Sequence, residues 1–425
     1  MIRPTLLAGL LLMAVSAGAE TLGEAWETAI ASHLRLAAAD ARRSAAGSEL
    51  EQAQAERMPR LGVTSSFMQL DEAPRFDFGA GQTSQKLFAG DNFVTAGVQV
   101  SVPLYTGGAI GAGIDAAEFA ASASDRQFDA VTRDIKLGTG ERYINVLRAE
   151  SALAVAESNV ATLKALADDA RNRYEVGDVP KNDYLATSVS LANAEQRRLQ
   201  AENVLDYARA AYNRFLNRPL DHTVTLDPDL DIDGLVPDAS LEELIRLARE
   251  ERDELDVLSS QAAALREQST AARADAKPQF ALTGGYMYLE NQFLNLDQYW
   301  MAGVSFQWSP FDGGRSRHRA AALEYRARAL NHTRDDLAMQ IALQVRGAWN
   351  DRQEALGRMR VTETAVEQAT ENLRVVRDRY NAGASANVEV LDGESLRQQA
   401  LSNRDDARYA LALARLRLAR AVGVL

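Results

Sequence analysis

Two stretches of the chain alternate apolar and polar positions with a period of two. From Trp300 to Trp308 every second residue is apolar, and the residues between them are mostly small or polar. The segment 94–104 alternates in the same way, and each stretch has a second candidate strand upstream, at 61–70 and at 280–288. A period of two is the signature of a strand with one apolar face. The pattern therefore predicts two β-hairpins.

Long stretches without proline follow these hairpins. No proline lies between Pro103 and Pro180, and none follows Pro310. Proline costs roughly 3 kcal/mol in a helix interior, so these gaps can hold long helices. We expect helices over Ile110–Tyr174 and Arg315–Tyr380, each roughly 100 Å long at about 1.5 Å per residue.

A helix is also expected before each hairpin. The first runs from Leu22 to about Met58 and is closed by Pro59; the second covers about 241–276 and is closed by Pro278. Proline directly after a helical run is a stop signal. Each half of the chain then reads as helix, strand pair, long helix, tight turn and helix.

The helices after the tight turns carry seams of residues spaced by threes and fours. Such a seam can serve tightly packed coils, a closed four-helix bundle or a free coiled coil. The pattern does not choose among the three. The seam residues are Leu185, Val189, Ala192 and Leu199 in the first helix, and Leu396, Ala400, Asn403, Ala407, Leu411, Ala414 and Leu418 in the second.

The two halves form an internal tandem duplication. Arg173–Gly177 is answered by Arg379–Gly383, and 379 − 173 gives an offset of 206. Tyr105–Gly108 is answered by Phe311–Gly314, and 311 − 105 is again 206. A repeat of this length is the unit of architecture. We expect a first structural repeat at 20–218, a linker at 219–239 and a second structural repeat at 240–425.

The repeats differ in length at one place. Pro59 pairs with Pro278, and 278 − 59 gives an offset of 219. The first repeat therefore has 219 − 206 = 13 additional residues, which lie between Leu70 and Phe93. We expect them to enlarge the loop between its two strands.

The N-terminus has the pattern of a secretory signal peptide. Arg3 gives a basic start, an apolar stretch covers Leu6–Val15, and Ala17–Ala19 has the small-residue pattern of a cleavage site. We expect residues 1–19 to be removed. The remaining chain has no apolar run long enough for a transmembrane helix, so a membrane role would have to use strands or a surface contact.

Composition and motifs argue against several classes of function. The formal net charge of −12 makes the chain a poor candidate for nucleic acid. There is no cysteine, and the four histidines show no ligand spacing, so we expect no metal site. No nucleophile elbow or phosphate-binding lysine motif occurs, which argues against an enzyme, and we expect no cofactor.

Glycine pairs follow both hairpins. The run Gly107–Gly113 lies after a strand, but its spacing is not that of a dinucleotide-binding loop. We interpret Gly107 and Gly108, with their counterparts Gly313 and Gly314, as bends from strand to helix.

The hairpin strands admit two environments. About ten alternating residues with aromatics toward the ends fit one pass of an outer-membrane barrel, and an ordinary half-buried hairpin of a soluble domain fits as well. Four strands do not close a barrel, and an open edge in lipid costs several kcal/mol for each unsatisfied group. A transmembrane sheet would therefore have to be shared between chains.

Repeated motifs give the chain a resemblance to a known family. They are the Arg-Tyr-x-x-Gly turns at 173 and 379, the helix start Val388–Asp392, the strand ends Tyr105-Thr-Gly-Gly and Phe311-Asp-Gly-Gly, and the ending 421–425. In these motifs, over essentially the whole mature sequence, the chain resembles the TolC-like outer-membrane efflux protein family.

The resemblance implies a mainly α fold with a transmembrane β-barrel portion. In this family three identical chains form a homotrimer, and each chain contributes four strands to a 12-stranded barrel in outer-membrane lipid. Long antiparallel coiled-coil helices continue as a periplasmic α-barrel tunnel. The resemblance places the protein in the outer membrane of a Gram-negative bacterium, extending into the periplasm.

It also implies a function and partners. The chain would be the exit duct of a tripartite efflux or type I secretion system. It would passively conduct substrates from an inner-membrane RND or ABC-type transporter through a periplasmic adaptor, also called a membrane fusion protein. The transported substrate and the identity of pump and adaptor do not follow from the sequence.

The tight turns would be the tips that meet the adaptor. The resemblance assigns adaptor docking to Val176 and Gly177 in the first turn and to Ala382 and Gly383 in the second. Helix capping alone also explains a glycine at each turn, because the left-handed conformation is unfavourable for residues with a Cβ.

The resemblance further implies a gate at this end of the tunnel. Glu389 and Asp392 would form acidic selectivity rings that favour cations, although acids in a first helical turn also simply favour the dipole. Asp183 and Tyr380 would close the aperture. The arginine that reinforces closure in this family falls on Ser385, so either closure would rest on fewer polar contacts or the resting aperture would be looser.

Two other classes stay open at this point. A periplasmic adaptor also has a signal peptide and a coiled-coil hairpin, but normally one hairpin flanked by β-domains and an inner-membrane tether. A soluble structural coiled coil would use the hairpins only as caps and would need no detergent for extraction.

Overall fold

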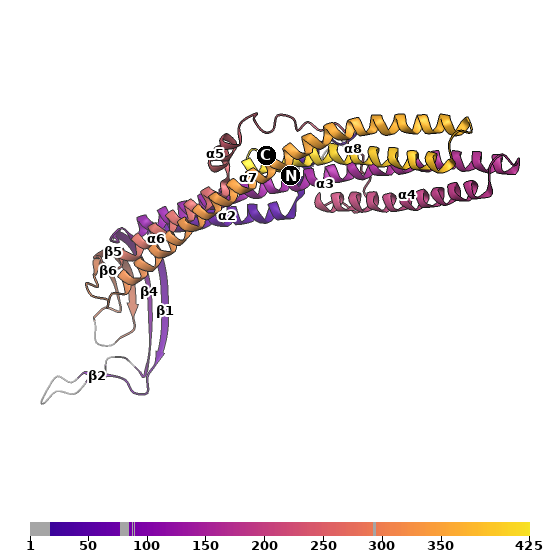
Figure 1. The fold of residues 1–425 in the computed structure, drawn as a ribbon. Coiled ribbons are helices and arrows are strands. Elements are labelled where there is room, and N and C mark those ends of the chain that lie inside the picture. The colour runs from indigo at the N-terminus through magenta and orange to yellow at the C-terminus, as the bar shows by residue number, and fades with distance from the viewer. Residues whose placement is uncertain (1–17, 77–84, 87, 89, 292–294) are drawn as a thin grey trace, which may run out of the picture. The chain divides into compact units, whose positions relative to one another are not determined.

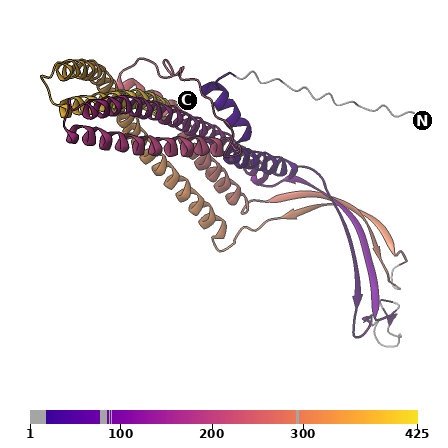
Figure 2. The ribbon, with the colours of Figure 1, turned by 90° about the vertical axis from the view of Figure 1, so that its right-hand side faces the viewer.

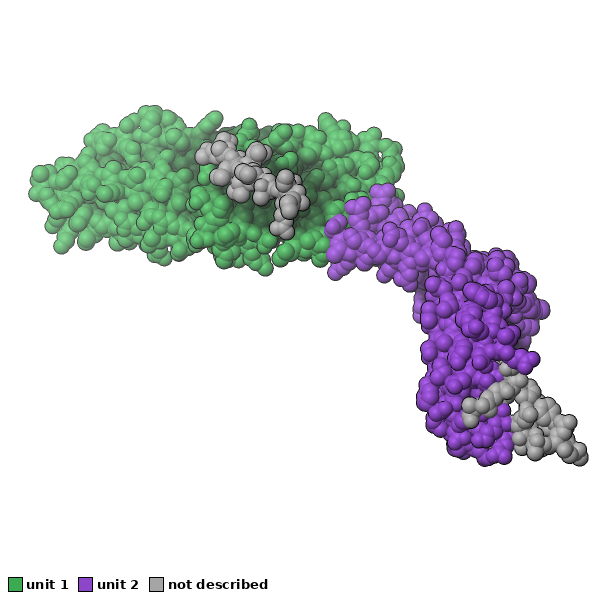
Figure 3. Space-filling model, turned by 180° about the vertical axis from the view of Figure 1, so that it is seen from behind, with its two compact units in different colours: residues 1–39, 128–253, 338–425 green, residues 40–127, 254–337 purple. Residues whose placement is uncertain are grey.

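The computed structural model describes residues 18–76, 85–86, 88, 90–291 and 295–425. Most of the expected signal peptide and part of the inserted segment therefore lie outside the described residues. The chain divides into two compact units (Figure 3). Unit 1 holds residues 1–39, 128–253 and 338–425, and unit 2 holds 40–127 and 254–337. Each unit contains parts of both sequence repeats.

Unit 2 contains a four-stranded antiparallel sheet (Figure 2). The strands are β1 (Arg60–Gln69), β4 (Asn92–Tyr105), β5 (Gln279–Leu289) and β6 (Gln298–Gln307), in the order β1-β4-β5-β6. The predicted alternation is confirmed. Val63, Val98, Tyr286 and Trp300 pair in one row across all four strands, so the apolar positions share a face. All ten residues of β1 and all ten of β6 are exposed.

The inserted segment carries a short strand pair that the sequence did not predict. Strand β2 (Arg75–Phe76) pairs antiparallel with β3 (Gln85–Lys86). Nearby, the rings of Phe88 and Phe93 stack with centroids 4.0 Å apart and planes 4° apart. The longer loop therefore has some structure of its own, while residues 77–84 lie outside the description.

The two predicted long helices are confirmed as single elements. Helix α3 (Ala109–Glu175) and helix α7 (Arg315–Asn381) each have 67 residues. Helix α4 (Lys181–Phe215) returns from α3, and α8 (Asn387–Val422) returns from α7 (Figure 1). Both turns have the predicted positions.

The helix before each hairpin is broken, which corrects the prediction of two unbroken helices. The first is α1 (Leu22–Ser32) followed by α2 (Leu34–Ala55), and the second is α5 (Leu241–Glu251) followed by α6 (Asp253–Ala274). The break residues are His33, with ψ 121°, and Arg252, with ψ 104°. They share the repeat offset, since 252 − 33 is 219.

Tertiary contacts in unit 1 account for the breaks. Buried Arg252 donates from Nη1 to the carbonyl oxygen of Ala421 at 3.0 Å, near the end of α8. His33 packs edge-on against Phe215 at the end of α4, with ring centroids 4.6 Å apart. Each break residue thus meets the end of the return helix of its own repeat. Neither position carries the proline or glycine that would mark a break in sequence.

The core of unit 1 gathers around two tyrosines. Tyr143 of α3 and Tyr212 of α4 are 0% exposed, and their rings meet edge-on at 6.2 Å. The Tyr143 hydroxyl donates to the carbonyl oxygens of Glu20 at 2.6 Å and Asp227 at 2.8 Å. Residues of α1 and α8, such as Leu22 and Leu416, complete this core. The start of the described chain is therefore fixed against the helices.

The two return helices bury different shares of their predicted seams. Five of the seven α8 seam residues are buried within the chain, at 0–9% exposed, and only Leu396 and Asn403 are exposed. The α4 seam faces outward instead, with Leu185, Val189 and Leu199 at 49%, 61% and 52% exposed. The face of α4 that packs inside the chain is a different one, made by Thr187, Ala194, Leu205, Tyr212 and Asn213.

Candidate functional site at the hairpin tips

The two tight turns of unit 1 have the same capped geometry. Gly177 has φ 76° and Gly383 has φ 71°, both in the left-handed region. At the first turn, Gly177 N donates to Tyr174 O at 3.0 Å and Asp178 N donates to Arg173 O at 2.8 Å. The second turn repeats the pattern 206 residues later. These bonds satisfy carbonyls that a helix end leaves free, and they need a residue without a Cβ penalty.

The tips are open surface in the isolated chain. Val176 is 81% exposed, and Ala382, Gly177 and Gly383 are also exposed. A Cβ added at either glycine would meet no heavy atom within 4 Å. Backbone conformation, and not lack of space, therefore requires glycine here.

Polar and aromatic contacts join the two tips. Arg173 Nη2 donates to Asn381 Oδ1 at 3.3 Å, and the same guanidinium lies 5.2 Å from the Tyr380 ring centroid. Within the first tip the rings of Tyr174 and Tyr184 stack 6.0 Å apart. The tips of one chain are thus held together by contacts that the sequence analysis did not identify.

The two predicted selectivity acids lie at the start of α8. Glu389 Oε2 is 3.7 Å from Arg379 Nη1, and the Glu389 side chain is 44% exposed. Asp392 is exposed, one turn further along. A third acid nearby is buried: Glu394 accepts from Arg397 Nη2 at 2.8 Å with a side chain that is 2% exposed. Glu394 therefore differs from the predicted pair in being buried as well as paired with an arginine.

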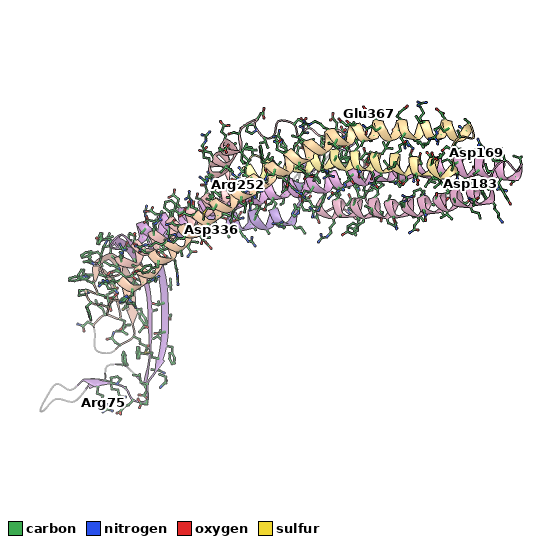
Figure 4. The ribbon with its side chains drawn as sticks, viewed as in Figure 1. Arg75, Asp169, Asp183, Arg252, Asp336 and Glu367 are labelled. Atoms are coloured by element: carbon green, nitrogen blue, oxygen red, sulfur yellow. The ribbon has the colours of Figure 1, made fainter. Side chains whose placement is uncertain are left out.

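Asp183, one of the two residues predicted to close the aperture, lies near the turn between α3 and α4 (Figure 4). The other, Tyr380, stands near the end of α7, beside the second turn. Asp183 accepts at its carboxylate from Asn182 Nδ2 at 3.1 Å. The hydroxyls of Tyr380 and Ser385 are buried and have no hydrogen-bond partner within the described part of the chain. Burial raises the pKa of the Tyr380 hydroxyl, opposed by the charge of Arg173. A closing contact through Asp183 or Tyr380 stays a prediction.

Asn387 was missed by the sequence analysis. Its amide joins α8 to α4 through Thr187 Oγ1 at 2.9 Å and the Asp183 carbonyl oxygen at 3.1 Å. An Asn at a helix start looks like an ordinary cap in sequence. The only available signal was the mismatch between repeats, since Lys181 stands at the position 206 residues before Asn387.

The four predicted bend glycines all have positive φ. The values are 67° for Gly107, 94° for Gly108, 70° for Gly313 and 84° for Gly314. At Gly107 an added Cβ would lie 2.8 Å from Lys277 Cβ, so close approach also requires glycine there.

At the second bend the start of α7 is capped by Asp312. Its carboxylate accepts from the amides of Gly314 at 2.9 Å and Ser316 at 2.8 Å, and also from the Ser316 hydroxyl. The bonds from Ser316, its hydroxyl above all, lower the pKa of the Asp312 carboxyl to about 2.

The described residues hold neither a metal-binding cluster nor a membrane-spanning helix. No group of three or more histidine, aspartate or glutamate side chains there could hold a metal ion. None of the described helices is both long enough and apolar enough to cross a membrane.

Known proteins match both the sequence and the fold. The chain is 23% identical to the outer membrane protein TolC of Vibrio cholerae over 416 residues, covering 96% of this chain and 91% of TolC. It is 24% identical to the alkaline protease secretion protein AprF of Pseudomonas aeruginosa, covering 71% of this chain and 64% of AprF. The solved outer-membrane channel OprN matches with a TM-score of 0.79 and 19% identity, covering 95% of this chain and 89% of OprN.

A family model covers both halves of the duplication. The model of the outer membrane efflux protein family matches residues 25–218 and 244–424. The matched ranges contain both tips, all four long strands and all four bend glycines. On this match the chain belongs to the outer membrane efflux protein family.

Proposed function

We propose that the protein is the outer-membrane exit duct of a tripartite efflux or type I secretion system. It lies in the outer membrane, extends into the periplasm and conducts substrates passively, with energy supplied by an inner-membrane pump. Family membership and the likeness of the fold to a solved outer-membrane channel support this function. The role is one of transport and needs no catalytic group in the chain.

The open sheet carries the proposal. Strands β1 and β6 form its two edges, and every residue of both is exposed within one chain. Large apolar side chains lie along them, including Val63 at 74% and Trp300 at 82% exposed. Edges and an apolar face of this kind need other strands and lipid to cover them. Copies of the same chain supply both edges in a closed ring.

The exposed seam of α4 supports the same assembly. Leu185, Val189 and Leu199 carry the heptad spacing of a packed coil, yet the described part of the chain leaves about half of each side chain exposed. A helix of a neighbouring copy is the natural partner. We take the assembly to be a homotrimer, in which three sheets of four strands close one barrel.

The hairpin tips, at one end of each chain, indicate the partners of the assembly. The exposed tips around Val176 and Ala382 form the surface for a periplasmic adaptor, which connects to an inner-membrane RND or ABC-type transporter. The name of AprF denotes secretion of a protease, and the family name denotes efflux. The cargo of this chain is set by the pump that it joins.

The acids at the tips set ion preference in this proposal. Glu389 and Asp392 stand in the first turns of α8, close to the tips. Three copies of each would ring the axis and favour cations.

Reconstitution tests the function directly. Detergent-extracted protein from outer membranes is expected to run as a crosslinkable trimer and to form ion-conducting channels in planar lipid bilayers. A protein that is released without detergent and gives no channels would fit the structural coiled coil instead. Crosslinking in cells from tip positions would then identify the adaptor and the pump.

A further inference from the structure

A buried hydrogen-bonded link joins the two helical hairpins of the chain near their tips. Asn387 Nδ2 donates to Thr187 Oγ1 at 2.9 Å and to the Asp183 carbonyl oxygen at 3.1 Å. The Thr187 hydroxyl donates to the same carbonyl at 2.9 Å. Asn387 is 5% exposed and Thr187 is 0% exposed. Because its hydroxyl both accepts and donates, Thr187 holds the Asn387 amide in one position.

The surroundings of the link are apolar and tightly packed. Val390, on the next turn of α8, is 0% exposed. One turn further, an added Cβ at Gly393 would lie 3.0 Å from Val376 Cγ2. Buried polar groups that lose a partner are costly unless water replaces it. The hydrogen bonds of the link are therefore made while the hairpins are packed together. When the hairpins separate, water has to replace the lost partners.

The link occurs once in the duplicated chain. The position equivalent to Asn387 is Lys181, since 387 − 206 = 181, and the position equivalent to Thr187 is Gly393, since 187 + 206 = 393. Lys181 is exposed, and glycine has no side chain to accept a bond. The equivalent pair, Lys181 and Gly393, therefore cannot form such a link. The two hairpins differ in this respect.

We propose that Asn387 and Thr187 are a positioning pair that holds the two hairpins of one chain together and keeps the tunnel aperture narrow. The inference rests on the proposed exit-duct function. The hydroxyls of Ser385 and Tyr380 have no partner within the described chain, and the Arg173–Asn381 bond that joins the tips is exposed. The Asn387 link adds a contact between the hairpins that is buried and uncharged. Unlike an ion pair, it keeps its strength at high salt.

Substitutions at Thr187 test the pair with little change of shape. Thr187→Val removes the hydroxyl, while Thr187→Ser retains it. In planar bilayers we expect Thr187→Val to raise the open probability about fivefold, the factor expected from one lost hydrogen bond. Thr187→Ser should behave as the unaltered protein. Ser190→Ala is the matched control, because the Ser190 hydroxyl bonds only to Ala186 O of its own helix among the described residues.

A cysteine pair gives an independent test, because the chain has no cysteine of its own. The double variant Thr187→Cys with Asn387→Cys should form a disulfide within one chain under oxidising conditions. We expect the oxidised channels to stay narrow and to recover full conductance after reduction.

Several results would overturn the proposal. They are an unchanged open probability in Thr187→Val, a disulfide that joins different chains, and a conductance that is insensitive to reduction. Absence of any channel from the unaltered protein would instead overturn the exit-duct function, and the role of the pair with it.

Discussion

At the residue scale, the selectivity role proposed for the acids at the start of α8 predicts a difference between Glu389 and Asp392. Glu389 has Arg379 at 3.7 Å, whereas no ion pair involving Asp392 occurs among the described residues. We therefore expect Asp392→Asn to weaken cation preference more than Glu389→Gln, and the double variant to weaken it most. The reversal potential under a salt gradient measures this. The effect should be largest at low salt, since the screening length falls from about 30 Å at 0.01 M to about 3 Å at 1 M.

Asp378→Asn provides the control for the acid pair. Asp378 is also an acid near the second tip, but its carboxylate pairs with Arg374 at 2.9 Å. Removing it should leave the reversal potential nearly unchanged. An unaltered ion preference in the Glu389→Gln, Asp392→Asn double variant would contradict the selectivity role.

The cap that Asp312 forms at the start of α7 should depend on pH. Hydrogen bonds from Ser316 and Gly314 lower the pKa of this carboxyl from 3.8 to about 2. A lowered pKa means that the charged form is favoured in the folded chain, so the cap is fully present above about pH 4. Its contribution is lost as the pH falls toward 2. We expect the protection factors of the Gly314 and Ser316 amides, measured against the intrinsic exchange rate at each pH, to fall over that range.

The Asp312→Ala variant isolates the cap. Without the carboxylate, the same two amides should have low protection factors already at neutral pH, and the further fall between pH 4 and 2 should disappear. Exchange that matches the unaltered protein at every pH would show that the carboxylate does not protect this helix start.

At the element scale, the tip glycines separate helix capping from docking. Gly177→Val and Gly383→Val force a β-branched residue into the left-handed region, at a cost of about 1–2 kcal/mol for each residue. We expect these variants to lose export while keeping a trimer, because the strain is confined to the tips. Gly177→Asn is the matched control, since asparagine tolerates this conformation. The measurements are substrate export in cells and crosslinked trimer on gels. Loss of the trimer would favour a capping role alone.

Helix boundaries show what local sequence can predict. The capping boxes of Thr21 with Glu24 and of Ser240 with Glu243 are local signals, and they mark helix starts. The tip glycines and alternating strands are equally local, so their positions were predicted. The breaks at His33 and Arg252 were missed because they depend on partners far away in sequence. The same reason hid the Asn387–Thr187 link, whose residues are 200 positions apart.

At the scale of the whole molecule, the seams show where a single chain is incomplete. The sequence predicted a seam on both return helices but could not say which one faces a neighbour. The structure separates them, because Ala407 and Leu418 of α8 are 0% exposed while Val189 of α4 is 61% exposed. The spacing is similar on both helices, so only the packing of the other helices decides the difference. A seam exposed in this way favours pairing with another copy.

Charge placed on the α4 seam should therefore prevent assembly without unfolding the chain. Full burial of a large apolar side chain contributes about 1.5–3 kcal/mol. Val189 is 61% and Leu199 52% exposed, so Val189→Asp with Leu199→Asp removes roughly one such contribution from each interface and buries unpaired charges as well. Light scattering in detergent should show monomers, with the helix content preserved by circular dichroism. Val189→Ile with Leu199→Met keeps the seam apolar and should remain trimeric. Trimers of the charged variant would mean that neighbouring copies meet on another face of unit 1, and that the α4 seam has a different partner.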